Sequence, residues 1–164
     1  MNTSHTLRAL TLALLMLSCV ASSALGGILI VANKAAQTLT VSVDGQRLYS
    51  WPTSTGREGY DTPAGTYSVI PSCTRAGWVS AVEWDVELKN PICFRFAGVY
   101  QSKSGPVNMY DSIHGMNAPG VGQPHSHGCI RLSNEHSDIL FPLVEARLGE
   151  TTVVVVGATK KRRK

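Results

Sequence analysis

The sequence is organised around Ile113-His114-Gly115 and, after a loop rich in glycine and proline, Ser126-His127-Gly128-Cys129-Ile130-Arg131. Two histidines, a cysteine and an arginine stand here among glycines, which allow tight turns and a close approach of backbone to ligand. An imidazole can accept the proton of a thiol and so prepare the thiolate for nucleophilic attack. The stretch therefore predicts a site for thiolate chemistry.

This stretch resembles the active-site signature of the L,D-transpeptidase catalytic domain of the YkuD type. Four further motifs agree with that family in their order along the chain: Gln46-Arg47-Leu48-Tyr49, Ser54-Thr55-Gly56, Thr62-Pro63-Ala64-Gly65-Thr66-Tyr67 and Asn134-Glu135. The resemblance covers roughly residues 28–157. The gap between His114 and Ser126 is shorter than in several family members.

That family cross-links bacterial peptidoglycan through a cysteine nucleophile. The resemblance therefore implies that Cys129 attacks the substrate and that His114 is its base. It also implies that the backbone carbonyl of Gly115 fixes the tautomer of the imidazole, as a carboxylate does in serine enzymes. The oxyanion of the reaction needs hydrogen-bond donors, and the backbone N–H groups of Gly128 and Cys129 are expected to supply them.

The other residues of the motif have supporting roles in this interpretation. Ser126 and His127 are expected to shape the turn, and His127 to line the cleft. Arg131 is expected to bind a substrate carboxylate with two parallel hydrogen bonds. The alternative for Arg131 is a structural ion pair with Glu135 or Asp138.

The implied reaction is an acyl transfer in two steps. The thiolate attacks the carbonyl between meso-diaminopimelate and a terminal D-residue of a peptidoglycan stem peptide, releases that residue and forms a thioester. The amine of a second stem peptide then resolves the thioester and gives a 3-3 cross-link. Water as acceptor would make the protein an L,D-carboxypeptidase, and a protein acceptor would make it an attachment enzyme for wall proteins. No cofactor is expected.

Two functions of other classes compete with this one. His114, His125, His127 and Cys129 have the chemistry of zinc ligands, but their spacing matches no standard zinc pattern, so no metal is expected. A module that binds wall polymer without catalysis would not need the intact Cys129, His114 and Arg131. His125 has no role in the motif and is expected to be a solvated loop residue.

Residues 1–24 are predicted to be a secretory signal peptide. Arg8 precedes the apolar run Ala9–Val20, which is too short to span a membrane, and small residues up to Ala24 provide a cleavage site. In a second interpretation, Leu17-Ser18-Cys19 is a lipoprotein processing box and Cys19 becomes a lipid anchor. Both interpretations predict an exported protein of the periplasm or cell envelope.

Removal of the leader leaves three cysteines, Cys73, Cys93 and Cys129. An odd number in an exported protein suggests one disulfide and one free thiol, and three pairings are open. If Cys129 is the nucleophile, as the resemblance implies, Cys73 and Cys93 are left to pair. The alternative is that both are buried and reduced.

Charge is unevenly distributed along the 164 residues. Of 15 Lys and Arg, five form the last five residues and Arg8 lies in the leader, which leaves nine basic against eleven acidic residues in the body. Residues 158–164 are expected to form a disordered basic tail, which either attaches to an anionic wall or membrane surface or has no partner. Nucleic acid is not an expected partner, because the body is not basic.

Residues 25–157 are predicted to form one catalytic domain of mainly β structure, because turn signals and strand-like alternation dominate. The resemblance implies a compact, β-sandwich-like mixed sheet with one or two short helices. Asp44-Gly45 predicts a tight hairpin. Strands are expected over nine ranges: Ile28–Val31, Thr38–Val43, Gln46–Trp51, Thr66–Ile70, Val79–Leu88, Ile92–Phe96, Val107–Ile113, Ile130–Leu132 and Thr151–Val156.

Aromatic residues are concentrated in the middle of the chain. Trp78 and Trp84, with Phe94 and Phe96, are expected in the core. In similar proteins a hairpin from this region covers the active site, so the alternative is that one tryptophan stacks on the substrate. Asp61–Gly65 is expected to be a turn that only positions strands.

A helix is predicted after the site. Ser133 is a suitable N-cap, and Glu135 in the first turn suits the helix dipole. Apolar residues recur at helical spacing up to Leu148. Pro142 is expected to kink this helix or divide it in two, and Gly149 to end it.

Overall fold

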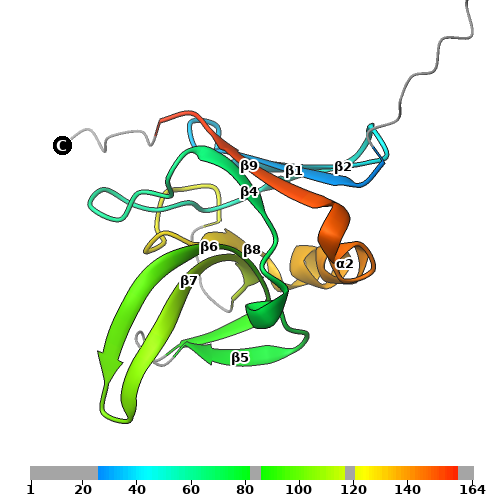
Figure 1. Cartoon of the computed structure of the whole chain (residues 1–164). Helices are drawn as coiled ribbons and strands as arrows, with labels where there is room; N and C mark the ends of the chain where they lie inside the picture. The colour runs from blue at the N-terminus through cyan, green and yellow to red at the C-terminus, as the bar shows by residue number, and fades with distance from the viewer. Residues whose placement is uncertain (1–25, 82–85, 117–120, 159–164) are drawn as a thin grey trace, which may run out of the picture.

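The computed structural model describes residues 26–81, 86–116 and 121–158. The predicted leader, the tail from residue 159 onward and Trp84 lie outside these residues. The described part is mainly β, with two mixed sheets and one α-helix, as predicted (Figure 1). No helix within it is long and apolar enough to cross a membrane.

The first sheet has five strands in the order β3-β2-β1-β9-β4. β1 and β9 run parallel, and the other neighbours run antiparallel. Asp44 and Gly45 have φ angles of 50° and 80° and join β2 to β3, so the predicted hairpin is confirmed. The strands are β1 Ile28–Asn33, β2 Thr38–Val43, β3 Gln46–Pro52, β4 Gly65–Ser68 and β9 Thr151–Val156.

The second sheet has four strands in the order β5-β6-β7-β8. β6 and β7 form a long antiparallel hairpin that extends from the body of the molecule, and β8 lies parallel to β7 (Figure 1). The strands are β5 Trp78–Ala81, β6 Val86–Ser102, β7 Gly105–Gly115 and β8 Ile130–Leu132.

Two strand predictions in this sheet are wrong. Val79–Leu88 is not one strand, because β5 pairs antiparallel with the start of β6. The expected break at Lys89-Asn90-Pro91 is instead a bulge within β6, where the register shifts between Lys89 and Ile92 and Asn90 has a φ of 49°. A bulge allows a strand to carry a proline without losing its direction, because it takes the residue out of the ladder.

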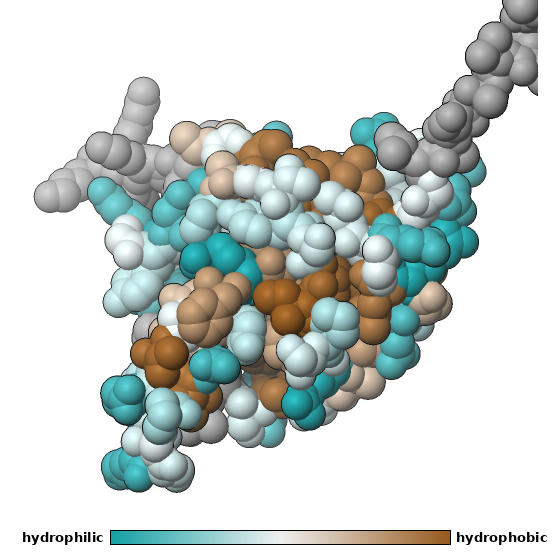
Figure 2. All heavy atoms as spheres, in the orientation of Figure 1, coloured by the Kyte–Doolittle hydropathy of each residue, from teal (hydrophilic) through white to brown (hydrophobic). Residues whose placement is uncertain are grey.

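The hydrophobic core lies between the two sheets and α2. Buried and less buried residues alternate along β1 and β9, so the first sheet turns one face to the core. Phe94 is in the core as predicted, but Trp78 and Phe96 are 44% and 50% exposed. Both belong to strands of the second sheet that extend beyond the core, and Figure 2 shows apolar side chains on the surface of the projecting hairpin.

Helix α2 spans Asn134–Glu145 and follows β8 directly. The Ser133 side chain accepts a hydrogen bond from the His136 N–H at 3.2 Å, as expected of an N-cap. Pro142 lies inside this single helix. The predicted end at Gly149 is wrong, because α2 ends at Glu145 and Gly149 belongs to a separate 3-10 turn.

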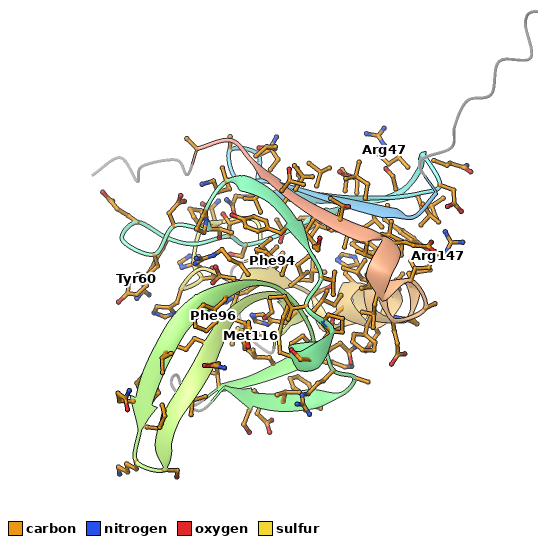
Figure 3. The ribbon with its side chains drawn as sticks, in the orientation of Figure 1. Arg47, Tyr60, Phe94, Phe96, Met116 and Arg147 are labelled. Atoms are coloured by element: carbon orange, nitrogen blue, oxygen red, sulfur yellow. A yellow bond between two sulfur atoms is a disulfide. The ribbon has the colours of Figure 1, made fainter. Side chains whose placement is uncertain are left out.

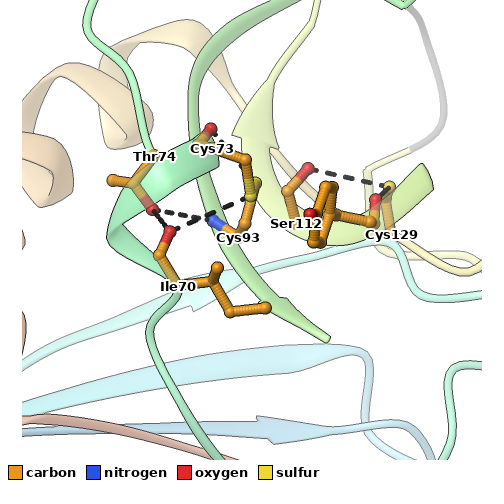
Figure 4. Close-up of a disulfide and its surroundings, with 7 residues drawn as sticks. Ile70, Cys73, Thr74, Cys93, Ser112 and Cys129 are labelled. Atoms are coloured by element: carbon orange, nitrogen blue, oxygen red, sulfur yellow. Dashed lines mark hydrogen bonds between the residues drawn. A yellow bond between two sulfur atoms is a disulfide. The ribbon is translucent and has the colours of Figure 1, made fainter. Parts of the chain in front are cut away.

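Cys73 and Cys93 form a disulfide (Figure 4). Cys73 belongs to a 3-10 turn, η1 at Pro71–Cys73, and Cys93 lies in β6. The bond ties the connection after β4 to the second sheet. Cys129 is the free cysteine of the described residues.

Candidate active site

The two halves of the histidine and cysteine motif meet as neighbouring parallel strands. Ile113 of β7 pairs with Ile130 of β8, and His114 pairs with Arg131. Cys129 immediately precedes β8, so it lies beside the end of β7. The chain thus returns, after the loop between the strands, to the end of β7 that carries His114.

The residues of the motif open onto one pocket of about 180 Å³. Cys129, His114, His127 and Arg131 all line it. The β6–β7 hairpin and the residues next to it supply the apolar part of the lining, namely Val86, Leu88, Ala97, Met109 and Met116. Figure 3 shows Met116 beside this hairpin. The pocket therefore combines a thiol, imidazoles and a guanidinium with an apolar wall.

His114 is 2% exposed and its Nδ1 lies 3.0 Å from the carbonyl oxygen of Gly115. A carbonyl only accepts, so Nδ1–H is the donor and Nε2 keeps the lone pair of a base. Burial lowers the pKa of His114 to about 4, the Gly115 carbonyl opposes this shift, and the charge of Arg131 adds to it. The imidazole is therefore neutral at physiological pH.

The close approach of Gly115 to α2 explains why this position has no side chain. A Cβ at Gly115 would lie 2.8 Å from Asn134 Oδ1 and 2.9 Å from Ser137 Cβ. The strand end that carries His114 is therefore packed directly on the helix.

Cys129 has a neighbour that the sequence analysis missed. Its Sγ lies 3.7 Å from the hydroxyl of Ser112 (Figure 4). Burial raises the pKa of the Cys129 thiol and the charge of Asp111 adds to the rise, whereas hydrogen bonds from Ser112 and the charge of Arg131 lower it. The net shift is upward, so the thiol is protonated in the free protein at neutral pH.

The turn that presents Cys129 is held by hydroxyl groups. Ser126 Oγ donates to the Cys129 carbonyl at 2.5 Å and accepts from the Gly128 N–H at 3.2 Å. Thr62 Oγ1 donates to the Gly128 carbonyl at 2.8 Å and accepts from the Gly56 N–H at 2.9 Å. The Gly128 N–H thus has a partner in the free protein, and its role as an oxyanion donor stays a prediction.

Thr62 also changes the interpretation of the turn at Asp61–Gly65. The role of this turn is structural, as predicted, but extends beyond the strands, because its threonine also holds the backbone of the cysteine turn. The threonine stood in a motif of the resemblance, but nothing in the sequence showed that its hydroxyl reaches Gly128.

Asp111 supports the same turn from the second sheet. It is buried and accepts a hydrogen bond from Arg95 Nε at 2.6 Å, while burial raises the pKa of its carboxyl. Gly128 has a φ of 123°, and a Cβ there would lie 2.6 Å from Asp111 Oδ1. A charged residue in a predicted strand next to the motif was the signal for Asp111 in the sequence.

The segment after β3 is hydrogen-bonded to the backbone of the motif. Ser54 and Arg131 exchange two backbone hydrogen bonds, of 3.0 and 2.8 Å. Ser126 N–H donates to the Thr55 carbonyl, and Arg57 N–H donates to the Ser126 carbonyl. The Ser54-Thr55-Gly56 motif therefore fixes the cysteine turn on the side away from β7.

Arg131 does not form the structural ion pair that was its alternative role. Asp138 accepts from Lys89 Nζ at 2.6 Å and from Asn90 at 2.9 Å instead. In the described ranges no ion pair joins Arg131 to Glu135. The Nε atom of Arg131 is buried and has no hydrogen-bond partner there.

His127 is held at the rim of the pocket. Its Nε2 lies 2.7 Å from Arg57 Nη2, and its ring meets the Tyr60 ring edge-on at 4.6 Å. Burial lowers the pKa of His127, and the charges of Arg57 and Arg131 lower it further. Neither Arg57 nor Tyr60 was identified from the sequence.

His125 is exposed, as expected, and lies apart from the pocket of Cys129. It lines a second pocket together with Lys34, Gln37 and Arg57. Among the residues that the structure describes, no group of three or more His, Cys, Asp or Glu is arranged to hold a metal ion.

The family model of the L,D-transpeptidase catalytic domain, YkuD, matches residues 27–156. The chain therefore belongs to this family, and the resemblance seen in the sequence is confirmed. No curated protein matches the chain in sequence.

Solved structures of L,D-transpeptidases share the fold. The enzyme from Stackebrandtia nassauensis is 22% identical with a TM-score of 0.65, and the match covers 83% of this chain and 58% of that one. The enzyme from Mycobacterium smegmatis is 23% identical with a TM-score of 0.59, covering 80% and 59%. L,D-transpeptidase 3 from Mycobacterium tuberculosis, in complex with a faropenem-derived adduct, is 22% identical with a TM-score of 0.57, covering 80% and 60%. The chain thus spans about three fifths of the length of these relatives.

Proposed function

We propose that the protein is a peptidoglycan L,D-transpeptidase that forms 3-3 cross-links through a cysteine thioester. One observation carries the proposal: Cys129 and His114 line the same pocket, and His114 donates from Nδ1 to the Gly115 carbonyl, which leaves Nε2 as the base. Membership of the family supports the same substrate class.

In the first step His114 Nε2 takes the proton of the Cys129 thiol as the sulfur attacks the carbonyl between diaminopimelate and the terminal D-residue. The carbon–nitrogen bond breaks, the imidazolium returns the proton to the leaving amine, and a thioester remains. The Cys129 N–H is the donor proposed for the oxyanion, with the Gly128 N–H able to join only if it leaves Ser126.

Arg131 is proposed to bind the carboxylate of the residue that leaves. Its guanidinium interacts electrostatically with Cys129, it lines the same pocket, and its buried Nε has no hydrogen-bond partner in the described part of the chain. A carboxylate would supply that partner and compensate the charge. Ser112 is proposed to donate its hydroxyl hydrogen to the sulfur as negative charge develops there.

In the second step an amine of another stem peptide attacks the thioester and gives its proton to His114. The sulfur leaves and regains a proton from the imidazolium, which restores the neutral pair. With water as acceptor the same site would act as an L,D-carboxypeptidase, and with a protein amine it would attach a wall protein.

The products of one substrate distinguish these outcomes. The protein is incubated with a tetrapeptide stem that ends in diaminopimelate and D-alanine, in water enriched in oxygen-18, and the products are resolved by mass spectrometry. A transpeptidase gives a cross-linked dimer and free D-alanine, while a carboxypeptidase gives only tripeptide that carries the heavy oxygen. Cys129→Ala is the control, and release of no D-alanine by the wild-type protein would contradict both forms of the proposal.

Export to the periplasm or cell envelope is part of the proposal. The leader at residues 1–24 supports it, with ordinary cleavage preferred to a lipid anchor at Cys19. The basic tail at residues 158–164 is proposed to contact anionic wall polymer or a membrane surface. A mature protein that begins at Met1 would contradict the export proposal.

A further inference from the structure

A cluster of three side chains stands at the rim of the pocket and has no part in the reaction proposed above. This rim cluster consists of Arg57, Tyr60 and His127. Arg57 packs its guanidinium over the Tyr60 ring, 4.8 Å from the ring centroid, and donates from Nη2 to His127 Nε2 at 2.7 Å. An arginine always donates, so His127 is held as the neutral tautomer with its proton on Nδ1.

The charge of Arg57 is not compensated by an ion pair with any residue that the structure describes. Arg57 forms no ion pair within the described ranges, not even with Glu58 beside it. The other carboxylates near the site are already used, because Asp61 pairs with Lys34 and Asp111 pairs with Arg95. The rim cluster therefore presents a fixed positive charge to the solvent.

A second positive charge lies within electrostatic reach. The charges of Arg57 and Arg131 both lower the pKa of His127, and the charge of Arg57 lowers that of Arg131. Arg131 lines the pocket of Cys129 together with His127, and Arg57 contacts His127, so both positive charges act on the same imidazole. This arrangement costs free energy in the absence of an anion and is stabilised by an anion that binds there.

Arg57 is also linked to two cavities, to one directly and to the other through His127. It lines a second pocket, of about 730 Å³, while its partner His127 lines the pocket of Cys129. A peptide that fills the small pocket and extends past His127 would pass over the Arg57 guanidinium. The Tyr60 ring and His127 hold this guanidinium in place, so little conformational entropy is lost when a ligand binds.

We propose that Arg57, held by Tyr60 and His127, is a second carboxylate-binding residue that selects substrates carrying a carboxylate outside the reaction centre. The identity of that ligand as a stem-peptide carboxylate rests on the proposed function. Arg131 takes the carboxylate next to the bond that breaks, and Arg57 takes one farther along the peptide, on diaminopimelate or on the preceding D-glutamyl residue.

The proposal is tested by binding without turnover, in protein that carries Cys129→Ala. Affinity is measured by calorimetry for the tetrapeptide stem and for three forms in which one carboxylate each is amidated: the terminal one, that of diaminopimelate and that of D-glutamate. Each is measured with Arg57 intact, with Arg57→Gln and with Arg57→Lys. Arg47→Gln is the matched control, since it removes the same charge from β3, far from Tyr60 in Figure 3.

Arg57→Gln is expected to weaken binding of the unmodified peptide about tenfold, because a hydrogen-bonded charge pair is lost. The effect should vanish for one internally amidated peptide, which identifies the carboxylate, and persist for the peptide amidated at its terminus. Arg57→Lys should restore part of the affinity, and Arg47→Gln should leave it unchanged.

Equal loss of affinity for all four peptides, or no loss for any, would overturn the proposal. An effect abolished only by amidation of the terminal carboxylate would overturn it too, because that carboxylate is assigned to Arg131. If Arg57→Gln does not fold, the Cys129→Ala protein with Arg57 intact is measured at increasing salt concentration. Its preference for peptides that keep one particular internal carboxylate must then weaken, and a preference that does not depend on salt would overturn the proposal. The assay needs no chemistry, so failure of the wild-type protein to release D-alanine is a separate result.

Discussion

Cys129 and His114 share a pocket in which burial favours their neutral forms. The thiol pKa is raised and the imidazole pKa is lowered to about 4, so a resting thiolate–imidazolium pair is not the stable state. The proton must then move as the substrate is attacked, when the charge that forms on sulfur is met by the hydroxyl of Ser112. The proposed reaction therefore needs general-base catalysis by His114 rather than a preformed ion pair.

Alkylation of Cys129 should report this protonation state. Iodoacetamide reacts with thiolates, so the rate should be lower than that of a free thiol at neutral pH and should keep rising above pH 9. The rate is measured by intact mass from pH 5 to 10, with glutathione as reference. A plateau reached near pH 6 would show a preformed thiolate and contradict the neutral pair.

Gly128 is the residue at which the turn tolerates least change. In Gly128→Ala the new Cβ would meet Asp111 Oδ1, and the φ of 123° disfavours any side chain. We expect a loss of about 3 kcal/mol in the free energy of unfolding and of about a hundredfold in the acylation rate. Urea unfolding and single-turnover acylation measure the two effects.

Gly122→Ala is the control for this prediction. Gly122 has a φ of 101° but nothing lies within 4 Å of a Cβ placed there. This variant should lose about 1 kcal/mol through backbone strain alone and acylate at a nearly normal rate. Equal damage from both substitutions would show that the contact with Asp111 does not matter.

At the scale of elements, the active site depends on segments from both sheets. β7 delivers His114, β8 follows Cys129, and the connection after β3 lies beside β8 and supports the turn. Thr62 joins this connection to the turn through its two hydrogen bonds. Thr62 itself is therefore structural for the site although it does not line the pocket of Cys129.

Thr62→Val tests this coupling. Valine keeps the volume but leaves the buried Gly56 N–H and Gly128 carbonyl without partners, which should cost about 3 kcal/mol in the free energy of unfolding. Acylation should slow as well, because the turn loses its support. Thr66→Val, at an exposed position of β4, should change both quantities little. A normal acylation rate in a folded Thr62→Val protein would contradict the coupling.

Much of the element order could be predicted from local signals. Asp44-Gly45 has the backbone preference of its hairpin, and Ser133 has the chemistry of its N-cap, so both were found. Signals of this kind depend on neighbours in the chain. The bulge at Asn90 depends on pairing with β7, which no local pattern encodes, and the expected break there was therefore wrong.

The candidate site also combines residues that a local motif predicts with residues that only the packing of distant segments brings together. Cys129, His114 and Arg131 were predicted because they stand in one motif, and the structure brings them to one pocket. Arg57 and Asp111 were missed because they reach the site only through the packing of separate segments. Their partners, His127 and Arg95, are 70 and 16 residues away in the chain.

At the scale of the whole molecule, the two sheets and α2 enclose the core, and His114 is buried where β7 packs on the helix. A buried base is useful for catalysis but makes the folded state sensitive to acid. The energy that keeps His114 neutral comes from the packing of the entire fold.

Stability should therefore fall between pH 6.5 and pH 4. In this range the unfolded chain binds a proton on His114 and the folded chain does not, so lowering the pH favours unfolding by about 3 kcal/mol. Asp111 acts in the opposite direction, because its raised pKa lets the folded state bind a proton more readily. Urea unfolding of wild type and His114→Asn from pH 7 to pH 4.5 measures the difference, and equal slopes would contradict the assignment.

Cys129, with His114 as its base, is proposed to form a covalent acyl-enzyme. The most direct test is the intact mass of the protein after incubation with faropenem, followed by peptide mapping. We expect one adduct, of faropenem or a fragment of it, on Cys129, with none in Cys129→Ala and much slower formation in His114→Asn. An unmodified wild-type protein, or an adduct that survives in Cys129→Ala, would contradict it.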